Sequence, residues 1–407
     1  MKIIDGGVTA PKGFKAAAHA AQIKYKGRDD MALIFSEVPC AYAGTFTSNV
    51  AKAAPVIWDR TILNEVKSAQ AVVINSGIAN ACTGKEGLEI CDKTAIAVAD
   101  ELKLDKNQVL VASTGVIGMQ IPIDKICAGV KELSGKLDST REAAHAAECA
   151  IMTTDTMPKE LAVTIDIDGV EVTIGAMTKG SGMIHPNMCT MLCFVMTDCD
   201  IDQALLQKAL SSIVDDTYNM ISVDGDQSTN DTCVVLANGM AGNKKITAED
   251  DNYKKFYEAL LYLNTELAKK MAGDGEGATA LFEVVVENAN TVKEAKILAK
   301  SVIESSLVKA AIYGHDANWG RIICALGYAG VDFDPEAVDL KFVSENGEIE
   351  IAKAGVSLNF DEEVATKILS AEAVTAVCNM HQGSASATAW GCDLTYDYVK
   401  INADYRS

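Results

Sequence analysis

The chain has 407 residues, of which 49% are hydrophobic and 23% charged, as in an ordinary soluble globular protein. Its 36 Lys and Arg residues face 56 Asp and Glu residues, and the net charge of −20 argues against a nucleic-acid partner because it repels phosphate backbones. No apolar run is long enough to span a membrane, and the first residues lack the apolar segment of a secretory signal. The 12 cysteines are scattered, without a CxxC pair or a zinc-type cluster, so we expect a cytoplasmic protein with reduced thiols and no metal site.

Strand-like runs rich in Val and Ile alternate with amphipathic stretches along almost the whole chain, which predicts a mixed α/β fold. The predicted strands cover residues 71–76, 108–114, 160–167 and 231–237. The predicted helices cover residues 87–103, 140–150, 201–213, 248–271 and 291–307. In the helix at 248–271 one face is apolar and consists of Phe256, Leu260, Leu263, Leu267 and Met271. The order of the strands cannot be read from this pattern.

A chain of this length has room for two domains or one very large one, yet no Pro- or Ser-rich linker and no internal repeat divides it. The one boundary that we predict is functional and lies between Cys189 and Thr190. It would give two pieces, 1–189 and 190–407. We expect both pieces to stay associated, because such a cut lies inside a folded body.

The segment from Lys179 to Asp198, KGSGMIHPNMCTMLCFVMTD, motivates this boundary. A Gly-rich loop meets an apolar strand there, and Thr190 stands at the join. If the chain is cut before Thr190, the new α-amine titrates near neutral pH and can act as the base for the threonine hydroxyl. The run CTMLCFVM also suits a buried strand in which Thr190 has no chemical role.

Two other Gly-containing segments hold candidate site residues. STGVIGMQIP, residues 113–122, follows a predicted strand, and there the Thr114 hydroxyl and the Gly115 N–H can form the donor pair of an oxyanion hole. A plain turn at the end of the strand explains the same residues and is the commoner case. AGDGEGAT, residues 272–279, places Glu276 either in solvent or against a cationic substrate group in a cleft.

Two further polar segments are interpreted as structural. SVDGDQSTND, residues 222–231, resembles a calcium loop only faintly, and Cys233 stands where such a loop has its closing Glu. We therefore predict a polar turn that leads into the strand at 231–237. YGHDANWGR, residues 313–321, is interpreted as a hydrogen-bonded turn at the start of a helix. No hydrolase-triad, zinc-protease or nucleotide-binding motif follows a predicted strand.

Ordered motifs extend over the whole chain: GGVTAPKGF near the start, VINSGIANACTG at 73–84, STGVIG at 113–118, TTDT at 153–156, KGSGMIHPNMCTML at 179–192, VDGDQSTND at 223–231, GDGEGAT, LVKAAIYGHDANWGR at 307–321 and the terminal WGCDLTYDYVKINADYRS. With these motifs the sequence resembles the ornithine acetyltransferase family, the glutamate N-acetyltransferases of arginine biosynthesis. The resemblance implies a layered αββα-type sandwich. It also shows two departures, since Cys189 replaces the usual alanine and Ile78 replaces an asparagine.

By this resemblance Thr190 is both the residue before which the chain cuts itself and the catalytic nucleophile. Cys189 is the residue on the other side of the cut. Thr114 and Gly115 match the oxyanion-hole pair of the family.

The resemblance also implies a set of substrate-contacting positions, which are Thr153, Lys179, Thr190, Glu276, Asn402 and Ser407. Lys179 suits the α-carboxylate of ornithine, and Glu276 suits its side-chain ammonium. The C-terminal tail must fold back over the cleft to bring Asn402 and Ser407 there.

The implied reaction transfers an acetyl group from N2-acetyl-L-ornithine to L-glutamate through an acetyl-threonine intermediate and yields ornithine and N-acetylglutamate. It requires no cofactor, and the use of acetyl-CoA as a further acetyl donor stays open. The implied assembly is a heterotetramer of two α and two β chains. Two alternatives remain: a related self-cleaving aminopeptidase or amidohydrolase, and an uncleaved, non-catalytic binding protein for a basic amino acid.

Overall fold

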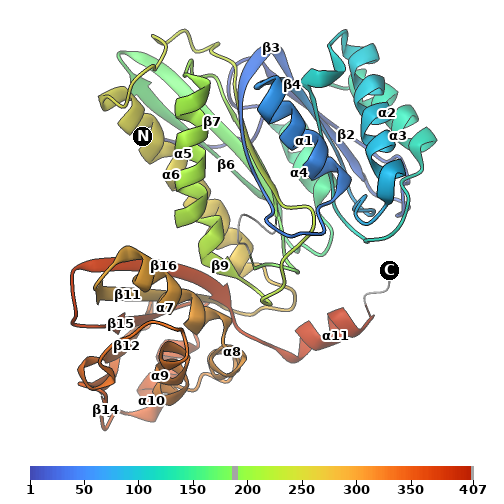
Figure 1. Cartoon of the computed structure of the whole chain (residues 1–407). Coiled ribbons are helices and arrows are strands. Elements are labelled where there is room, and N and C mark those ends of the chain that lie inside the picture. The colour runs from blue at the N-terminus through green and yellow to red at the C-terminus, as the bar shows by residue number, and fades with distance from the viewer. Residues whose placement is uncertain (186–190, 405–407) are drawn as a thin grey trace.

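The structure is a computed structural model that describes residues 1–185 and 191–404 (Figure 1). The chain forms two bodies, each built on its own β-sheet. The helix α6 (Asp251–Gly273) extends from the first body toward the second. Within the described residues every helix is too short or too polar to cross a membrane.

The first body contains a sheet whose strands, in spatial order, are β1 (Lys2–Ile4), β6 (Lys159–Ile167), β7 (Val170–Lys179), β8 (Leu192–Thr197), β10 (Thr232–Ala237), β3 (Met31–Phe46), β4 (Ser68–Asn75) and β5 (Val109–Ser113). A further strand, β2 (Phe14–His19), pairs with the first part of β3. The neighbours β8 and β10 are parallel, as are β4 and β5, whereas the other pairs are antiparallel. The other helices of this body are α1 (Ala54–Glu65), α2 (Gly84–Leu102), α3 (Ile123–Ser134), α4 (Arg141–Ile151) and α5 (Gln203–Asp216).

The register of the sheet shifts between Phe35 and Cys40 of β3, and there the sheet divides into two halves. The inner faces of both halves share one core with α1 and α4, to which Ile34 contributes from one half and Phe194 from the other. The outer face of the half with β6, β7, β8 and β10 packs on α5 and α6, and the outer face of the half with β2, β4 and β5 packs on α2 and α3. The order helix, sheet, sheet, helix confirms the predicted αββα sandwich.

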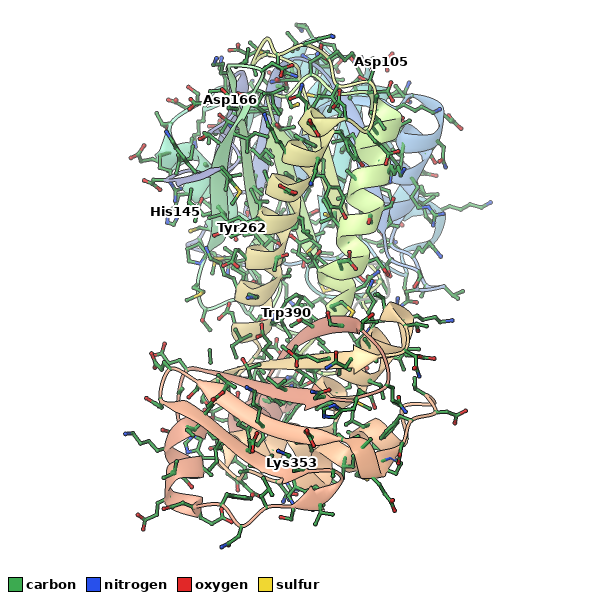
Figure 2. All side chains as sticks on the ribbon, turned by 90° about the vertical axis from the view of Figure 1, so that its left-hand side faces the viewer. Asp105, His145, Asp166, Tyr262, Lys353 and Trp390 are labelled. Carbon is green, nitrogen blue, oxygen red and sulfur yellow. The ribbon has the colours of Figure 1, made fainter. Side chains whose placement is uncertain are left out.

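The second body contains a sheet in the order β14 (Val356–Ser357), β13 (Gly347–Lys353), β12 (Asp339–Ser344), β15 (Ala373–Asn379), β11 (Leu281–Ala289), β16 (Ala385–Cys392) and β9 (Ile221–Ser222). Its helices are α7 (Val292–Glu304), α8 (Ser306–Tyr313), α9 (Trp319–Gly327) and α10 (Glu362–Leu369). They cover the face to which Phe282, Val284 and Val286 of β11 point. On the opposite face the end of α6 covers Trp390, with Lys269 over its ring, and the rest of that face is open (Figure 2). A last helix, α11 (Tyr396–Asp404), leaves this body and lies beneath the first (Figure 1).

The predicted helix at 248–271 corresponds to α6, and its five apolar residues are all fully buried. The side chain of Asp250 caps its first turn by accepting hydrogen bonds from the N–H groups of Asn252 and Tyr253, and Gly273 is its last residue. The segment at 313–321 also behaves as expected, because the Asn318 side chain caps the start of α9.

The sheet order bears directly on the predicted cut. Strands β8 and β10, which come after residue 190, lie between β7 and β3, which come before it. Strand β8 is paired with β7 over its whole length, and β10 is paired with β3 over its whole length. Breaking the connection between β7 and β8 would therefore leave the sheet intact.

Candidate functional site

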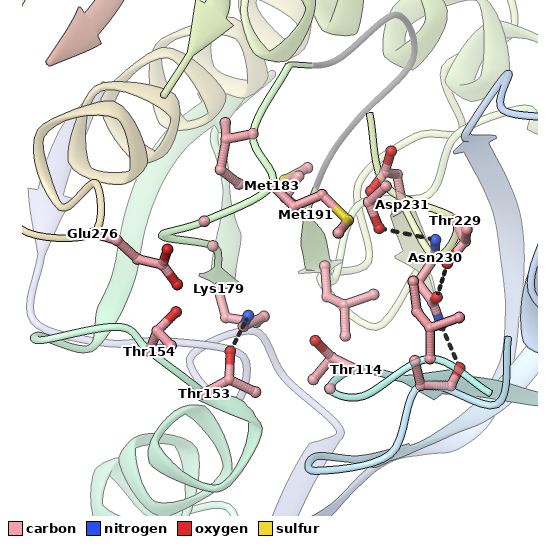
Figure 3. Close-up of a pocket in the computed structure, with 18 of the residues that line it drawn as sticks. Thr114, Thr153, Thr154, Lys179, Met183, Met191, Thr229, Asn230, Asp231 and Glu276 are labelled. Atoms are coloured by element: carbon pink, nitrogen blue, oxygen red, sulfur yellow. Dashed lines mark hydrogen bonds between the residues drawn. The ribbon is translucent and has the colours of Figure 1, made fainter. Parts of the chain in front are cut away.

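A pocket of about 160 Å³ lies where loops of the first body meet the loop after α6 and the helix α11 (Figure 3). Its lining includes the end of β5, the loop between α4 and β6, the end of β7 and the segment before β10. Six of the predicted site residues line it together: Thr114, Gly115, Thr153, Lys179, Glu276 and Asn402. The other three, Cys189, Thr190 and Ser407, lie outside the described residues.

The predicted oxyanion pair lies directly after β5. The Thr114 N–H donates to the Asn75 carbonyl at 3.0 Å, and this bond extends the pairing of β4 with β5 by one residue. Gly115 has a φ of +128°, and a Cβ there would lie 2.3 Å from the carbonyl carbon of Gly77. Only glycine fits this close backbone approach. Neither the Thr114 hydroxyl nor the Gly115 N–H has a hydrogen-bond partner among the described residues, so both can donate to a ligand.

Asn230 holds this turn in place. Its Nδ2 donates to the Ser113 carbonyl at 2.8 Å and to the Ala79 carbonyl at 2.6 Å, while its Oδ1 accepts from the Thr229 hydroxyl at 2.6 Å. The side chain thus ties the turn after β5 to the neighbouring loop after β4. Residues 222–231 form the predicted polar segment before β10, but the sequence pattern did not indicate that Ser228, Thr229, Asn230 and Asp231 line the pocket. The available signal was the family motif VDGDQSTND.

Lys179 provides the positive charge of the pocket. It is 7% exposed at the end of β7, and its Nζ donates to the Thr153 hydroxyl at 2.7 Å (Figure 3). Asp155 lies behind it, with Oδ2 3.5 Å from the same Nζ and Oδ1 2.8 Å from Nζ of the buried Lys159. Burial alone would raise the pKa of the Asp155 carboxyl, but the charges of Lys179 and Lys159 outweigh burial and hold that pKa well below its usual range.

Lys159 forms a second ion pair, with Asp274, in addition to its pair with Asp155. Lys159 Nζ donates to Oδ2 of Asp274 at 2.5 Å, and the other oxygen of Asp274 accepts from the Thr156 hydroxyl. The two lysines and two aspartates therefore balance in charge. The network therefore carries no net charge before an anionic group binds to Lys179, and it becomes negative by one charge when such a group binds.

Glu276 provides a negative charge across the pocket from Lys179 and is 8% exposed, and Asp231 is a second acidic residue of the lining. Its backbone N–H donates to the Ser181 carbonyl at 3.0 Å, which ties the loop after α6 to the loop after β7. A Cβ on Gly182 would lie 2.4 Å from the Glu276 carboxyl carbon, so glycine makes room for the acid. Nδ2 of Asn402 donates to the Glu276 Oε2 at 2.8 Å, and α11 has therefore folded back over the cleft as expected.

Asp224 fixes the loop that precedes the predicted cut. Its carboxylate accepts from the backbone N–H groups of Met183 at 2.6 Å and Ile184 at 2.9 Å. Burial raises the pKa of Asp224, although these backbone donors favour its ionised form. Burial likewise raises the pKa of Tyr398 on α11, and the charge of Asp224 adds to that effect. The loop 183–184 and the C-terminal helix therefore share one acidic anchor.

Residue 78, where the family usually has asparagine, lies outside the pocket lining. Ile78 is buried in the core beside α2, and its backbone carbonyl accepts from the side chain of Asn75 at 2.9 Å. Among the described residues no three His, Cys, Asp or Glu side chains are grouped closely enough to hold a metal ion.

The αββα sandwich and a small pocket that holds charged side chains are typical of a small-molecule enzyme, and comparison with known proteins gives its family. The chain matches the ArgJ family over residues 15–407. It is 52% identical to arginine biosynthesis bifunctional protein ArgJ 1 of Clostridium acetobutylicum, over 100% of this chain and 99% of that protein. It is 50% identical to the ArgJ protein of Thermotoga neapolitana, over 98% of this chain and 99% of that protein.

Two solved structures are also similar. The crystal structure of arginine biosynthesis bifunctional protein ArgJ from Bacillus halodurans is 49% identical with a TM-score of 0.50, and the match covers 52% of this chain and 98% of that one. The ornithine acetyltransferase of Mycobacterium tuberculosis, solved in complex with ornithine, is 42% identical with a TM-score of 0.44, and the match covers 46% of this chain and 99% of that one. The chain belongs to the ArgJ family.

Proposed function

We propose that the protein transfers an acetyl group from N2-acetyl-L-ornithine to L-glutamate in arginine biosynthesis. The family and the names of its curated relatives support the pathway. The observation that carries the substrate is the pair of buried, opposite charges in one small pocket, Lys179 and Glu276. They complement the α-carboxylate and the side-chain ammonium of ornithine.

The proposed maturation step creates the nucleophile. The Thr190 hydroxyl attacks the Cys189 carbonyl, and hydrolysis of the resulting ester leaves Thr190 with a free α-amine. An α-amine has a pKa of about 8, so a useful fraction is neutral and can take the hydroxyl proton. Met191, the next residue in the chain, lines the pocket, which supports a nucleophile at this place.

The proposed transfer has two half-reactions. Thr190 attacks the acetyl carbonyl of N-acetylornithine, and Thr114 and Gly115 donate to the oxyanion of the tetrahedral intermediate. Ornithine leaves with a proton from the Thr190 amine, and an acetyl-threonine ester remains. Glutamate then enters the same pocket, and its α-amine attacks the ester and carries the acetyl group away. This chemistry uses no cofactor.

The solved relative from Bacillus halodurans supports the cut, because 98% of that chain matches only 52% of this one. A β chain of residues 190–407 would be 218 of 407 residues, a similar share. The insertion of β8 and β10 between β7 and β3 supports lasting association of the pieces. We further propose that two α and two β chains assemble into a heterotetramer, as the family resemblance implies. We also propose that the protein is cytoplasmic.

The word bifunctional in the relatives' names favours a second activity. For this second activity we propose acetylation of glutamate with acetyl-CoA as donor, through the same Thr190 ester.

An assay with acetyl-labelled N-acetylornithine tests the main proposal. Labelled N-acetylglutamate should appear only when glutamate is present, with one ornithine released per transfer, and Thr190→Ala should abolish it. Release of free acetate without transfer would favour the amidohydrolase alternative. Ornithine binding without any turnover would favour the binding protein.

A further inference from the structure

A second cluster of reactive side chains lies on the surface of the first body, outside the pocket. His145 and Cys149 are one turn apart on α4, and the Cys149 Sγ lies 3.7 Å from the His145 Nε2. The other ring nitrogen, Nδ1, lies 2.6 Å from Oε1 of Glu160 on β6. His145 stands at the edge of the molecule in Figure 2. A thiol, an imidazole and a carboxylate thus follow one another in the order of a nucleophile, its base and the group that orients the base.

The Glu160 carboxylate, the last group in the series Cys149, His145 and Glu160, is rigidly held. Two N–H groups of Arg141 donate to Glu160, at 2.8 Å and 2.7 Å, and the Glu160 side chain is 8% exposed. A carboxylate held in this way favours the proton on the His145 Nδ1 and leaves Nε2 as an acceptor toward Cys149. Burial, with the charges of Glu148 and Glu160, raises the pKa of the Cys149 thiol. The thiol is therefore protonated at rest and needs a base in order to react.

We propose that Cys149 is a site of thiol modification, at which His145 acts as base and Cys149 forms a mixed disulfide with an oxidised low-molecular-weight thiol. His145 Nε2 takes the thiol proton as Sγ attacks one sulfur of the small disulfide. A new S–S bond forms to Cys149, the original S–S bond breaks, and the released thiolate takes the proton from His145. Cys149 is oxidised and the released half of the small disulfide is reduced, so atoms and electrons balance.

The chain contains its own control thiols. Cys82, Cys127 and Cys324 are also exposed, and within the described residues none of them has a hydrogen bond to a histidine. Cys127 is the best match because it lies on a helix, α3, and burial raises its thiol pKa too. A difference in rate between Cys149 and Cys127 therefore reports on His145.

The test incubates the native, full-length protein with excess oxidised glutathione and follows each cysteine by peptide mass mapping. Cys149 should form the mixed disulfide at least about tenfold faster than Cys127, a margin smaller than the about 10²- to 10⁴-fold that a positioned base typically contributes. His145→Asn should lower the Cys149 rate to that of Cys127 and leave Cys127 unchanged. Equal rates in the wild type, or an unchanged Cys149 rate in His145→Asn, would overturn the proposal.

A second variant tests the other link. Glu160→Gln should also slow Cys149 while Cys127 keeps its rate, because the imidazole loses the group that orients it. Cys378 is fully buried and should stay unmodified in both variants, which distinguishes a lost base from a lost fold. An unchanged Cys149 rate in Glu160→Gln would contradict the role of the carboxylate.

Discussion

Nδ2 of Asn402 donates a 2.8 Å hydrogen bond to Oε2 of Glu276, across 126 positions of the sequence. The bond closes one wall of the pocket with a carboxylate from the loop after α6 and an amide from the last helix. If the proposed function is right, a negative charge at this place should discriminate between the two substrates. Ornithine ends in an ammonium, which Glu276 attracts, whereas glutamate ends in a carboxylate, which Glu276 repels.

Removing that charge should therefore separate the two half-reactions. We expect Glu276→Gln to lower kcat/KM for N-acetylornithine by about tenfold or more, the loss of one charge-assisted contact. The kcat/KM for glutamate should stay the same or rise. Steady-state kinetics with each substrate varied in turn measures both values, and Asn402→Ala, which keeps the charge, is the control. Equal losses of kcat/KM for both substrates would show that Glu276 does not distinguish the side-chain charges of the two substrates.

The oxyanion role of Thr114 predicts a loss in rate rather than in binding. Thr114→Val keeps the shape and removes the hydroxyl, and kcat should fall by about 10²- to 10³-fold with little change in KM. Thr154→Val, in the same pocket but outside the donor pair, should have a much smaller effect on kcat. A rise in KM at unchanged kcat would assign Thr114 to substrate binding instead.

Asn230 should act through the turn that it holds. Asn230→Asp removes the two N–H donors to Ser113 and Ala79, so Thr114 and Gly115 lose their fixed position. We expect kcat to fall by at least about tenfold while KM stays nearly constant, since the charged groups that hold the substrate are elsewhere. Asn238→Asp removes comparable donors, to Lys12 and Ser36, outside the pocket lining, and should leave kcat unchanged. Equal effects of the two variants would contradict the positioning role.

His185, just before the predicted cut, should make stability depend on pH. Burial, with the charge of Lys300, lowers the pKa of His185 from 6.5 to about 4, although the Glu304 carboxylate lies 3.3 Å from Nδ1. Burial raises the pKa of Glu304 itself, which weakens its opposing effect. The unfolded chain therefore binds the proton first as the pH falls. The contribution of His185 to stability is complete above pH 6.5 and is lost as the pH falls toward 4.

Urea unfolding at several pH values between 6.5 and 4 measures this loss. The free energy of unfolding should decline less steeply in His185→Asn than in the wild type over that range. His381, an exposed histidine paired with Asp339, provides the control variant His381→Asn. Identical slopes for wild type and His185→Asn would show that His185 titrates normally.

Local pattern predicted part of the structure well. The apolar face from Phe256 to Met271 predicted α6, because an apolar side chain recurs every three or four residues, once in each helical turn. Asn318 was predictable as a helix start because capping involves only neighbours in sequence. The second body was not predictable as a separate unit, because no linker marks it and its sheet includes β9, which lies before α6 in the chain.

The site was predictable only where the resemblance supplied it. Whether Thr114 and Gly115 form a donor pair or a plain turn depends on the approach of Gly77, which no local pattern contains. Asn230 was missed for the same reason, since its acceptors are 117 and 151 residues away in sequence. The return of α11 to Glu276 was expected from the family and not from the residues of the tail themselves.

The most direct test of the central claim is the intact mass of the denatured protein, recorded before and after brief exposure to N-acetylornithine without glutamate. Before exposure we expect two polypeptides, one ending at Cys189 and one beginning at Thr190. After exposure the second should gain the mass of one acetyl group, located on the Thr190 hydroxyl, and glutamate should remove it. A single polypeptide of 43.1 kDa that never gains the acetyl group would contradict both the cut and the acetyl-threonine mechanism.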